Sequence, residues 1–212
     1  MEAHKKIYFK TEAEWLAYKK DKLGSSTAGT VAGLNKYETP FSLWERITHR
    51  TPELEQTEEM VHGVYMENSI RQIFKHYHPE VEFLRDLNQI LLYEHNDYPF
   101  IQSTPDDTVW FEGQEMNCEI KSTSAYQTPD EVPDYVIAQC QHQMLLSGHD
   151  KTLLIWDYVP ARRHGYMVID YDEAYAQDLI DVQVQFHDFV VNDTPPPART
   201  LSDFAKKDTV DA

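Results

Sequence analysis

Two acidic residues and a lysine stand in a pattern that can carry chemistry: Asp106, Glu119 and Lys121. Residues two apart in a β-strand share a face, so Glu119 and Lys121 point to one side while Ile120 enters the core. Asp106 follows Thr104-Pro105 in a turn before the preceding strand, so pairing of the two strands can bring it beside Glu119. Two converging carboxylates form a hard-oxygen site suited to Mg²⁺ or Mn²⁺. With an ammonium beside them to position or activate water, the pattern is typical of metal-assisted phosphodiester hydrolysis.

The same string also fits a solvent-facing hairpin with a salt-bridged Glu119–Lys121 pair, so its context has to decide. Glu67 lies in the middle of a helix expected to pack behind the sheet, where a third carboxylate can complete the coordination of one ion. Gln139 lies on the helix after the Glu119 strand, and its amide can orient the lysine or a scissile phosphate. Each is otherwise a surface residue of its helix. Together they favour the catalytic interpretation.

A third group near the N-terminus suits a phosphate. Ser26 opens a helix within the glycine- and hydroxyl-rich stretch 24–29, where free backbone N–H groups bind phosphate oxygens. Lys19, seven residues earlier, can add a cation. The alternative interpretation is a helix-capping serine and an exposed lysine.

Hydrophobic periodicity predicts helices followed by a mixed sheet, a crossing helix, two more strands and a closing helix. The expected helices span about 11–20, 26–31, 41–49, 58–76, 134–146 and 171–191. Ser26 or Thr27 is the expected N-cap of the second, and Pro40 pre-organises the third. The long helix 58–76 presents Val61, Tyr65, Ile70, Ile73, Phe74 and Tyr77 near helical spacing.

The expected strands span about 81–84, 89–93, 100–101, 108–111, 117–121, 151–158 and 165–170. Residues 112–115 have turn chemistry, so the strands on either side should form a hairpin.

Length and composition predict a single domain. Residues 1–191 should form it, with a helical part to about 78 and a sheet core at about 79–191, and 192–212 should be a proline-rich linker and polar tail. No apolar run approaches the roughly 18 residues that span a bilayer. The polar N-terminus leads into no signal-peptide core, so we expect a cytosolic protein. Cys118 and Cys140 are too few for a disulfide framework or a four-thiolate cluster and should be buried thiols.

The charge balance argues against DNA when taken alone. There are 19 Lys and Arg against 36 Asp and Glu, a net charge of −17, whereas DNA attracts clustered positive charge. A nuclease that gathers acids around metal ions presents the charge of those ions to the phosphate, so the net charge does not exclude nucleic acid.

The motifs together resemble the lambda exonuclease / YqaJ-type viral recombinase family, over roughly residues 15 to 170. The resemblance lies in the order and spacing of Trp15, Lys19, Ser26, Gly63, Glu67, Thr104-Pro105-Asp106, Glu119-Ile120-Lys121, Tyr135 and Ala138-Gln139-Cys140-Gln141, and in an N-terminal block containing 26–33, Tyr37, Thr39-Pro40 and Leu43-Trp44-Glu45.

The resemblance implies an α/β fold with a restriction-endonuclease-like core, in which helices flank a mixed β-sheet after an N-terminal helical segment. It implies a 5′ to 3′ exonuclease that loads on double-stranded DNA ends and uses two Mg²⁺ ions, with Mn²⁺ as a possible substitute. Asp106, Glu119, Glu67 and the backbone carbonyl of Ile120 would hold the metal. Lys121 would activate water, and Gln139 would support the site.

The resemblance also implies that Ser26 and Lys19 hold the 5′-phosphate. Family members form a ring-shaped trimer, work beside a single-strand annealing protein, and usually belong to phages or prophages. The resemblance therefore implies a protein of the cytoplasm of a bacterial host.

Two departures from the family pattern affect these expectations. The family commonly has Arg where Lys19 stands, and Lys lacks the planar fork for bidentate phosphate contact. The family commonly has Gly where Asp107 stands, and Asp107 could compete as a metal ligand. Two rival functions stay open: an endonuclease of the same fold, and a catalytically inactive module that binds DNA ends. His76 and His78 suit a helix end rather than zinc, and His142 is given no role.

Overall fold

The computed structural model describes residues 4–52, 57–86 and 88–197. The helices are α1 (Glu12–Lys19), α2 (Ser25–Val31), α3 (Pro40–Ile47), α4 (Glu58–Tyr77), α5 (Asp134–Ser147) and α6 (Glu173–Val191), with a short 3-10 helix at Pro129–Glu131. The strands are β1 (Lys5–Phe9), β2 (Leu23–Gly24), β3 (Glu82–Phe83), β4 (Ile90–Glu94), β5 (Ile101–Ser103), β6 (Asp107–Phe111), β7 (Gln114–Thr123), β8 (Lys151–Tyr158) and β9 (Arg163–Asp170).

Each of the six predicted helices is present, with its ends within two residues of the prediction. The predicted hairpin is also confirmed, since β6 pairs with β7 in antiparallel fashion around a turn at Glu112 and Gly113, which both have positive φ. Gly148 ends α5 in the left-handed conformation, which costs a residue without Cβ little.

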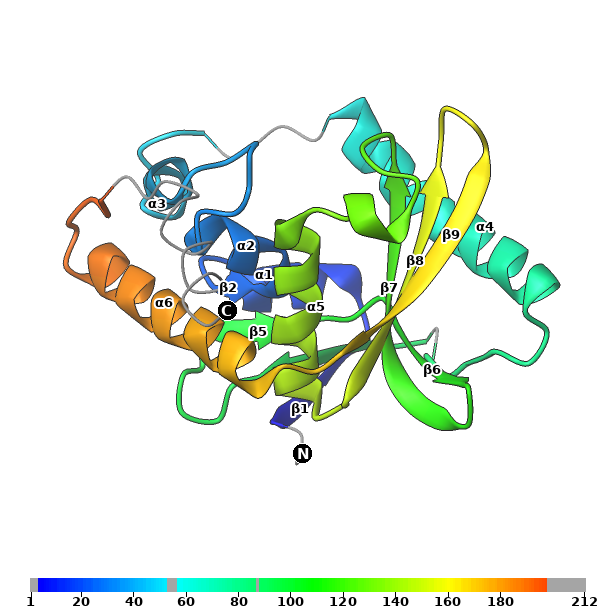
Figure 1. The fold of residues 1–212 in the computed structure, drawn as a ribbon. Coiled ribbons are helices and arrows are strands. Elements are labelled where there is room, and N and C mark those ends of the chain that lie inside the picture. Colours follow the sequence, from blue (N-terminus) through cyan, green and yellow to red (C-terminus); the bar gives the residue numbers. More distant parts are fainter. Residues whose placement is uncertain (1–3, 53–56, 87, 198–212) are drawn as a thin grey trace, which may run out of the picture.

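The strands form two sheets rather than the single mixed sheet expected. The larger has the order β3-β6-β7-β8-β9 and the smaller the order β1-β4-β5-β2. In the larger sheet β7 and β8 are parallel, and α5 crosses between them (Figure 1), because parallel neighbours need a crossover connection.

Helices cover both faces of the larger sheet, so alternate side chains of β7 point toward α4 and toward α5. On one face Cys118 and Ile120 pack with Ile70 and Phe74 of α4. On the other face α5 packs its Val136, Cys140 and Met144 against Leu154 and Trp156 of β8. Figure 1 shows α4 and α5 on opposite sides of the sheet. Both cysteines are buried free thiols, as predicted.

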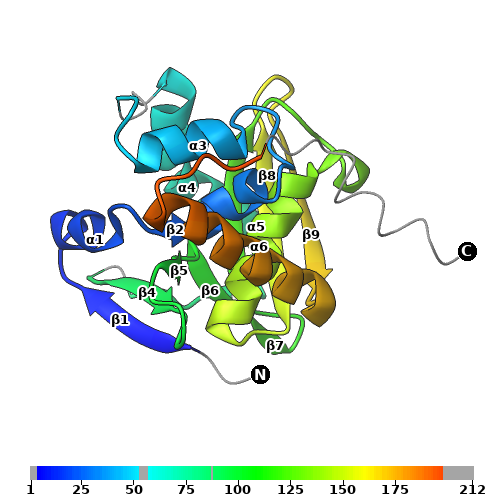
Figure 2. The same ribbon diagram turned by 90° about the vertical axis from the view of Figure 1, so that its left-hand side faces the viewer.

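The N-terminal part is not purely helical, which corrects the expected division into helices and then strands. β1 pairs with β4, Lys5 lying opposite Glu94, and β2 pairs in parallel with β5. Figure 2 shows β1 and β4 together at one edge, with α6 passing across α5. The partner of Lys5 lies 89 residues away in the chain, so local periodicity could not reveal this strand.

Two local predictions are wrong. α2 begins at Ser25 with Gly24 as its N-cap, so neither Ser26 nor Thr27 caps it; the Thr27 hydroxyl instead donates to the carbonyl of Gly24 at 2.8 Å. In α4, Val61 and Tyr65 are exposed although both fall at helical spacing with the core residues. Only the second half of α4 packs on the sheet, through Ile70 and Phe74.

Within the described residues, none of the helices combines the length and apolar character that crossing a bilayer would require. Residues 192–197 of the expected linker follow α6 without a helix or strand. The expectation of a polar tail at 198–212 lies outside the described residues.

Candidate active site

The edge of β7 that β6 leaves open forms the centre of the site. The β6–β7 pairing runs from the turn to Asp107, opposite Cys118. Beyond that pair, the Asp106 side chain takes the place of a backbone partner, its Oδ2 accepting the N–H of Ile120 at 2.8 Å. The N–H and C=O of one strand residue point to the same side, so the Ile120 carbonyl is also directed to this edge.

Glu119 is almost fully buried and is held by three side chains. Its Oε1 accepts from Gln139 Nε2 at 2.7 Å and pairs with Lys121 Nζ at 2.5 Å. Its Oε2 accepts from Gln143 Nε2 at 2.6 Å. Lys121 also donates to Gln139 Oε1 at 3.1 Å. The predicted shared face of Glu119 and Lys121 is therefore present, and α5 supplies both glutamines one helical turn apart.

The acids at this edge interact strongly. Burial, followed by the nearby Glu119 and Glu67 carboxylates, raises the pKa of Asp106 well above its usual value. Burial and then Glu119 also raise the pKa of Glu67, against the opposing effect of Arg71. Glu67 therefore interacts electrostatically with Asp106 and Glu119 from α4, which lies on the other side of the sheet from α5. Concentrated negative charge of this kind favours a bound cation.

Lys121 stays protonated in this environment. Burial alone would lower the pKa of its ammonium, but the Glu119 and Asp106 carboxylates outweigh burial and hold that pKa above the usual value. The side chain therefore presents a positive charge and hydrogen-bond donors beside the two carboxylates.

Asp107 is committed to other partners. Its Oδ2 pairs with Arg71 Nε at 3.0 Å, and its Oδ1 accepts the backbone N–H groups of Arg85 and Thr108, each at 2.8 Å. Arg85 also donates from its guanidinium to the carbonyl of Asp106 at 3.0 Å. The unexpected acid at 107 therefore serves to fix the turn that presents Asp106.

The residues fit a magnesium ion through their donor chemistry. Among the described residues, no group of three or more His, Cys, Asp and Glu side chains is arranged as a ready-made metal site. Mg²⁺ commonly takes one or two carboxylates and completes its six ligands with water and substrate phosphate. Asp106 and Glu119, with the Ile120 carbonyl, would supply such a partial set, and Glu67 would reach it from α4.

The predicted phosphate residues lie at the end of α1 and in the first turn of α2. Lys19 ends α1, with its Nζ 3.7 Å from the centroid of the Trp15 ring, and burial lowers the pKa of its ammonium. The Trp15 indole donates to Thr104 Oγ1 at 3.2 Å, two residues before Asp106. Ser26 is exposed in the first turn of α2. Within the described part of the chain, no hydrogen bond joins Lys19 to Ser26.

Three site residues were missed in the sequence analysis: Gln143, Arg71 and Arg85. Gln143 follows Gln139 by four residues and Arg71 follows Glu67 by four, so helical spacing could have indicated that each shares the face of its neighbour. Arg85 lies between β3 and β4 in no regular element, and no pattern identifies it.

A YqaJ-like viral recombinase domain matches residues 14–150. The chain belongs to this family. The YqaJ protein of Bacillus subtilis strain 168 is 32% identical over 140 residues, which cover 64% of this chain but only 42% of that protein. This member of the YqaJ-like family thus spans less than half of the curated relative it matches.

Solved structures support the fold. An alkaline exonuclease of Laribacter hongkongensis, LHK-Exo, superposes with a TM-score of 0.66 at 16% identity, covering 92% of this chain and 97% of that one. The same enzyme in complex with dAMP matches equally well. A phage-related exonuclease of Haemophilus somnus 129PT gives a TM-score of 0.57 at 12% identity, covering 81% of this chain and 96% of that one. The restriction-endonuclease-like α/β fold is consistent with these likenesses.

Proposed function

We propose that the protein is a Mg²⁺-dependent exodeoxyribonuclease that degrades one strand of duplex DNA from its 5′ end and leaves a 3′ single strand. The family and the exonuclease neighbours support a nuclease that acts on DNA. The observation that carries the proposal is the arrangement at the open edge of β7, where Glu119 and Lys121 of this strand meet Asp106 from the turn before β6.

The chemistry follows from what these residues hold. Two Mg²⁺ ions at the carboxylate oxygens would supply Lewis acidity and a water of lowered pKa. Asp106 and Glu119 would orient them, with the Ile120 carbonyl and Glu67 as further ligands. Lys121 would direct the attacking water or stabilise negative charge on the phosphorane-like transition state. Gln139, which hydrogen-bonds both side chains, would hold Lys121 and Glu119 in position. Ser26 and Lys19 would bind the 5′-phosphate.

We also propose the assembly, location and partner that the family resemblance implies. The protein would work in a bacterial cytoplasm as a ring-shaped homotrimer threaded by DNA, beside a single-strand annealing protein. An enclosing ring keeps the enzyme on its substrate without a strongly basic surface, which is compatible with the net charge of −17.

The test compares linear and covalently closed circular duplex DNA in Mg²⁺, with the linear DNA labelled at either its 5′ or its 3′ end. We expect the linear form to be degraded, the 5′ label to be released first, and the circle to survive. Lys121→Ala should lower the rate by about a thousandfold. Lys151→Ala is the matched control, because Lys151 forms its ion pair with Asp170 across β8 and β9, and it should keep wild-type activity.

Other outcomes would assign a different function. Cleavage of circles as fast as linear DNA would establish an endonuclease of the same fold. Binding of DNA ends without hydrolysis in either Mg²⁺ or Mn²⁺ would establish an inactive end-binding module.

A further inference from the structure

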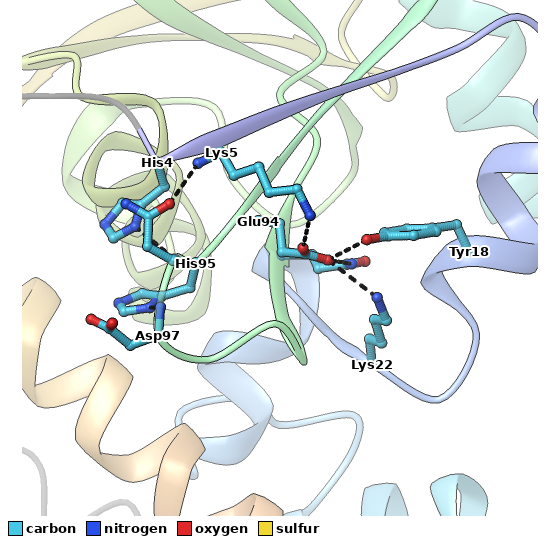
Figure 3. Close-up of polar contacts among 9 residues, drawn as sticks. His4, Lys5, Tyr18, Lys22, Glu94, His95 and Asp97 are labelled. Atoms are coloured by element: carbon cyan, nitrogen blue, oxygen red, sulfur yellow. Dashed lines mark hydrogen bonds and ion pairs between the residues drawn. The ribbon is translucent and has the colours of Figure 1, made fainter.

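A buried carboxylate outside the active site holds together the elements that would grip the DNA end. Glu94, the last residue of β4, is 3% exposed. Its Oε1 accepts from Lys5 Nζ at 2.8 Å. Its Oε2 accepts from Tyr18 OH at 2.6 Å, Gln102 Nε2 at 3.1 Å and Lys22 Nζ at 3.3 Å. Figure 3 shows Lys5, Tyr18 and Lys22 approaching this one side chain from different segments.

Two of the donors, Tyr18 and Lys22, belong to the segment that carries the expected phosphate-binding residues Lys19 and Ser26. Tyr18 immediately precedes Lys19, and Lys22 immediately precedes β2, whose Gly24 caps the helix that carries Ser26. The Lys22 ammonium also lies 3.7 Å from the centroid of the Tyr18 ring. The two ends of the short turn between α1 and β2 are therefore tied to one anion.

The same carboxylate is tied to the strand that leads to the metal site. Gln102 lies in β5, opposite Gly24 in the parallel β2–β5 pairing. Asp106 follows Gln102 by four residues. Between them, Thr104 accepts a hydrogen bond from Trp15 of α1. Glu94 thus links the Lys19–Ser26 segment to the segment that presents Asp106.

The cluster depends on an ionised Glu94, because this one carboxylate is the shared acceptor for two ammonium groups, a phenol and an amide. Burial opposes ionisation, but the hydrogen bonds from Lys5, Tyr18, Lys22 and Gln102 outweigh it and lower the pKa of Glu94 to about 2. Glu94 is therefore an anion throughout the neutral range. A neutral amide at this place would keep one acceptor oxygen and replace the other by an NH2 group, so the donors on one side would lose their acceptor and both ammonium groups would lose the negative charge.

We propose that Glu94 is a positioning residue that sets the Lys19–Ser26 segment at the distance from Asp106 required for recognition of a 5′-phosphorylated DNA end. This inference rests on the proposed function, because it assumes that the segment binds the terminal phosphate. The metal-binding side chains do not contact Glu94, so its loss should impair end recognition and spare the chemical step.

The test compares the wild-type chain with Glu94→Gln on duplexes of one sequence that end in 5′-phosphate or 5′-hydroxyl. We expect the wild type to prefer the phosphorylated end, and Glu94→Gln to reduce this preference in kcat/KM by about tenfold, since one charged phosphate contact is misplaced. The change should lie in KM, with kcat at saturating DNA within about twofold of wild type. DNA binding in the Lys121→Ala background should lose the same preference.

The matched control is Glu38→Gln. Glu38 forms two hydrogen bonds with Arg46 of α3, at 3.0 and 3.1 Å, so the same chemical change breaks a comparable ion pair elsewhere. It should keep the preference for 5′-phosphate. If Glu94→Gln fails to fold, Tyr18→Phe removes one hydrogen bond while keeping the ring, and should reduce the preference by about threefold.

The outcomes separate this inference from the proposed function. A folded Glu94→Gln protein that keeps the full preference, or that loses kcat equally on both ends, would overturn the positioning role alone. A wild-type enzyme that degrades 5′-phosphate and 5′-hydroxyl ends equally would overturn the proposed phosphate binding by Lys19 and Ser26, and the positioning role of Glu94 with it.

Discussion

Three side chains are needed to hold the single buried carboxylate of Glu119. Burying an ionised side chain is costly unless its oxygens are hydrogen-bonded. Gln139, Gln143 and Lys121 provide those bonds at 2.5–2.7 Å. The three donors also lock the rotamer, so the carboxylate is oriented before a cation or substrate arrives.

Gln143 should therefore matter as a positioning residue. Gln143→Leu removes the donor to Glu119 Oε2, and we expect it to lower activity, or the affinity for Mg²⁺, by about 10- to 100-fold. Metal titration followed by initial rates on linear DNA measures both quantities. Gln141→Leu is the control, because the equally buried Gln141 bonds the backbone of Asp170 and Asp172 instead. It should lose stability and keep the wild-type Mg²⁺ dependence; equal effects of the two changes would refute the role of Gln143.

At the scale of elements, α5 connects the two halves of the proposed site. One face gives Gln139 and Gln143 to Glu119. Another face gives His142, whose ring is bonded to Ser25 Oγ at 2.9 Å and to Gln183 Oε1 at 2.8 Å. α2 approaches so closely that a Cβ on Gly29 would lie 2.6 Å from the Cβ of Tyr135. The helix that orients Glu119, the proposed metal ligand, therefore also packs against the helix that carries Ser26.

This contact between helices should make folding sensitive to acid. Burial lowers the pKa of His142 from 6.5 to about 4, so between these values the unfolded chain takes up a proton that the folded chain does not. The contribution of neutral His142 to stability is complete above pH 6.5 and is lost as pH falls toward 4. It should cost about 2 kcal/mol between pH 7 and pH 5.

Urea unfolding of the wild type and of His142→Gln at the two pH values measures this contribution. Other groups affect both proteins, so the quantity of interest is the difference between their pH dependences. His142→Gln should be less stable at pH 7 and should lose less stability on acidification. Parallel pH profiles would show that His142 is not the responsible group.

At the scale of the whole molecule, the excess of acidic residues sets a condition for binding DNA. The phosphate backbone is repelled by a protein of net charge −17 unless cations intervene. The acids of the proposed centre concentrate this repulsion where the scissile phosphate would lie. Bound Mg²⁺ would reverse the local sign of charge.

Removal of divalent cations should therefore weaken binding itself, beyond stopping hydrolysis. For Lys121→Ala, which we expect to bind DNA with greatly slowed hydrolysis, the affinity for a 5′-phosphorylated duplex should fall by at least about tenfold when EDTA replaces Mg²⁺. Fluorescence anisotropy at constant ionic strength measures the change. Adding Asp106→Asn to Lys121→Ala should reduce this metal dependence. If the DNA affinity of the single and the double variant is the same with and without Mg²⁺, the proposed role of the ions is contradicted.

Patterns between near neighbours in the chain were sufficient to predict much of this protein. The alternation in β7 placed Glu119 and Lys121 on one face, and the spacing in α5 placed Gln139 toward them. The six helices and the β6–β7 hairpin were predicted for the same reason. Side-chain periodicity and turn chemistry are local, so the sequence alone determines them.

Contacts between distant segments were decided only by the tertiary structure. The N–H of Ile120 donates to Asp106 Oδ2 because the β6–β7 pairing ends just before that point, and Asp107 pairs with Arg71 because α4 packs behind the sheet. Glu94 meets Lys5 because β1 pairs with β4 across 89 residues. Such contacts depend on strand order and helix packing, which minimise the free energy of the whole chain and leave no periodic trace in any one segment.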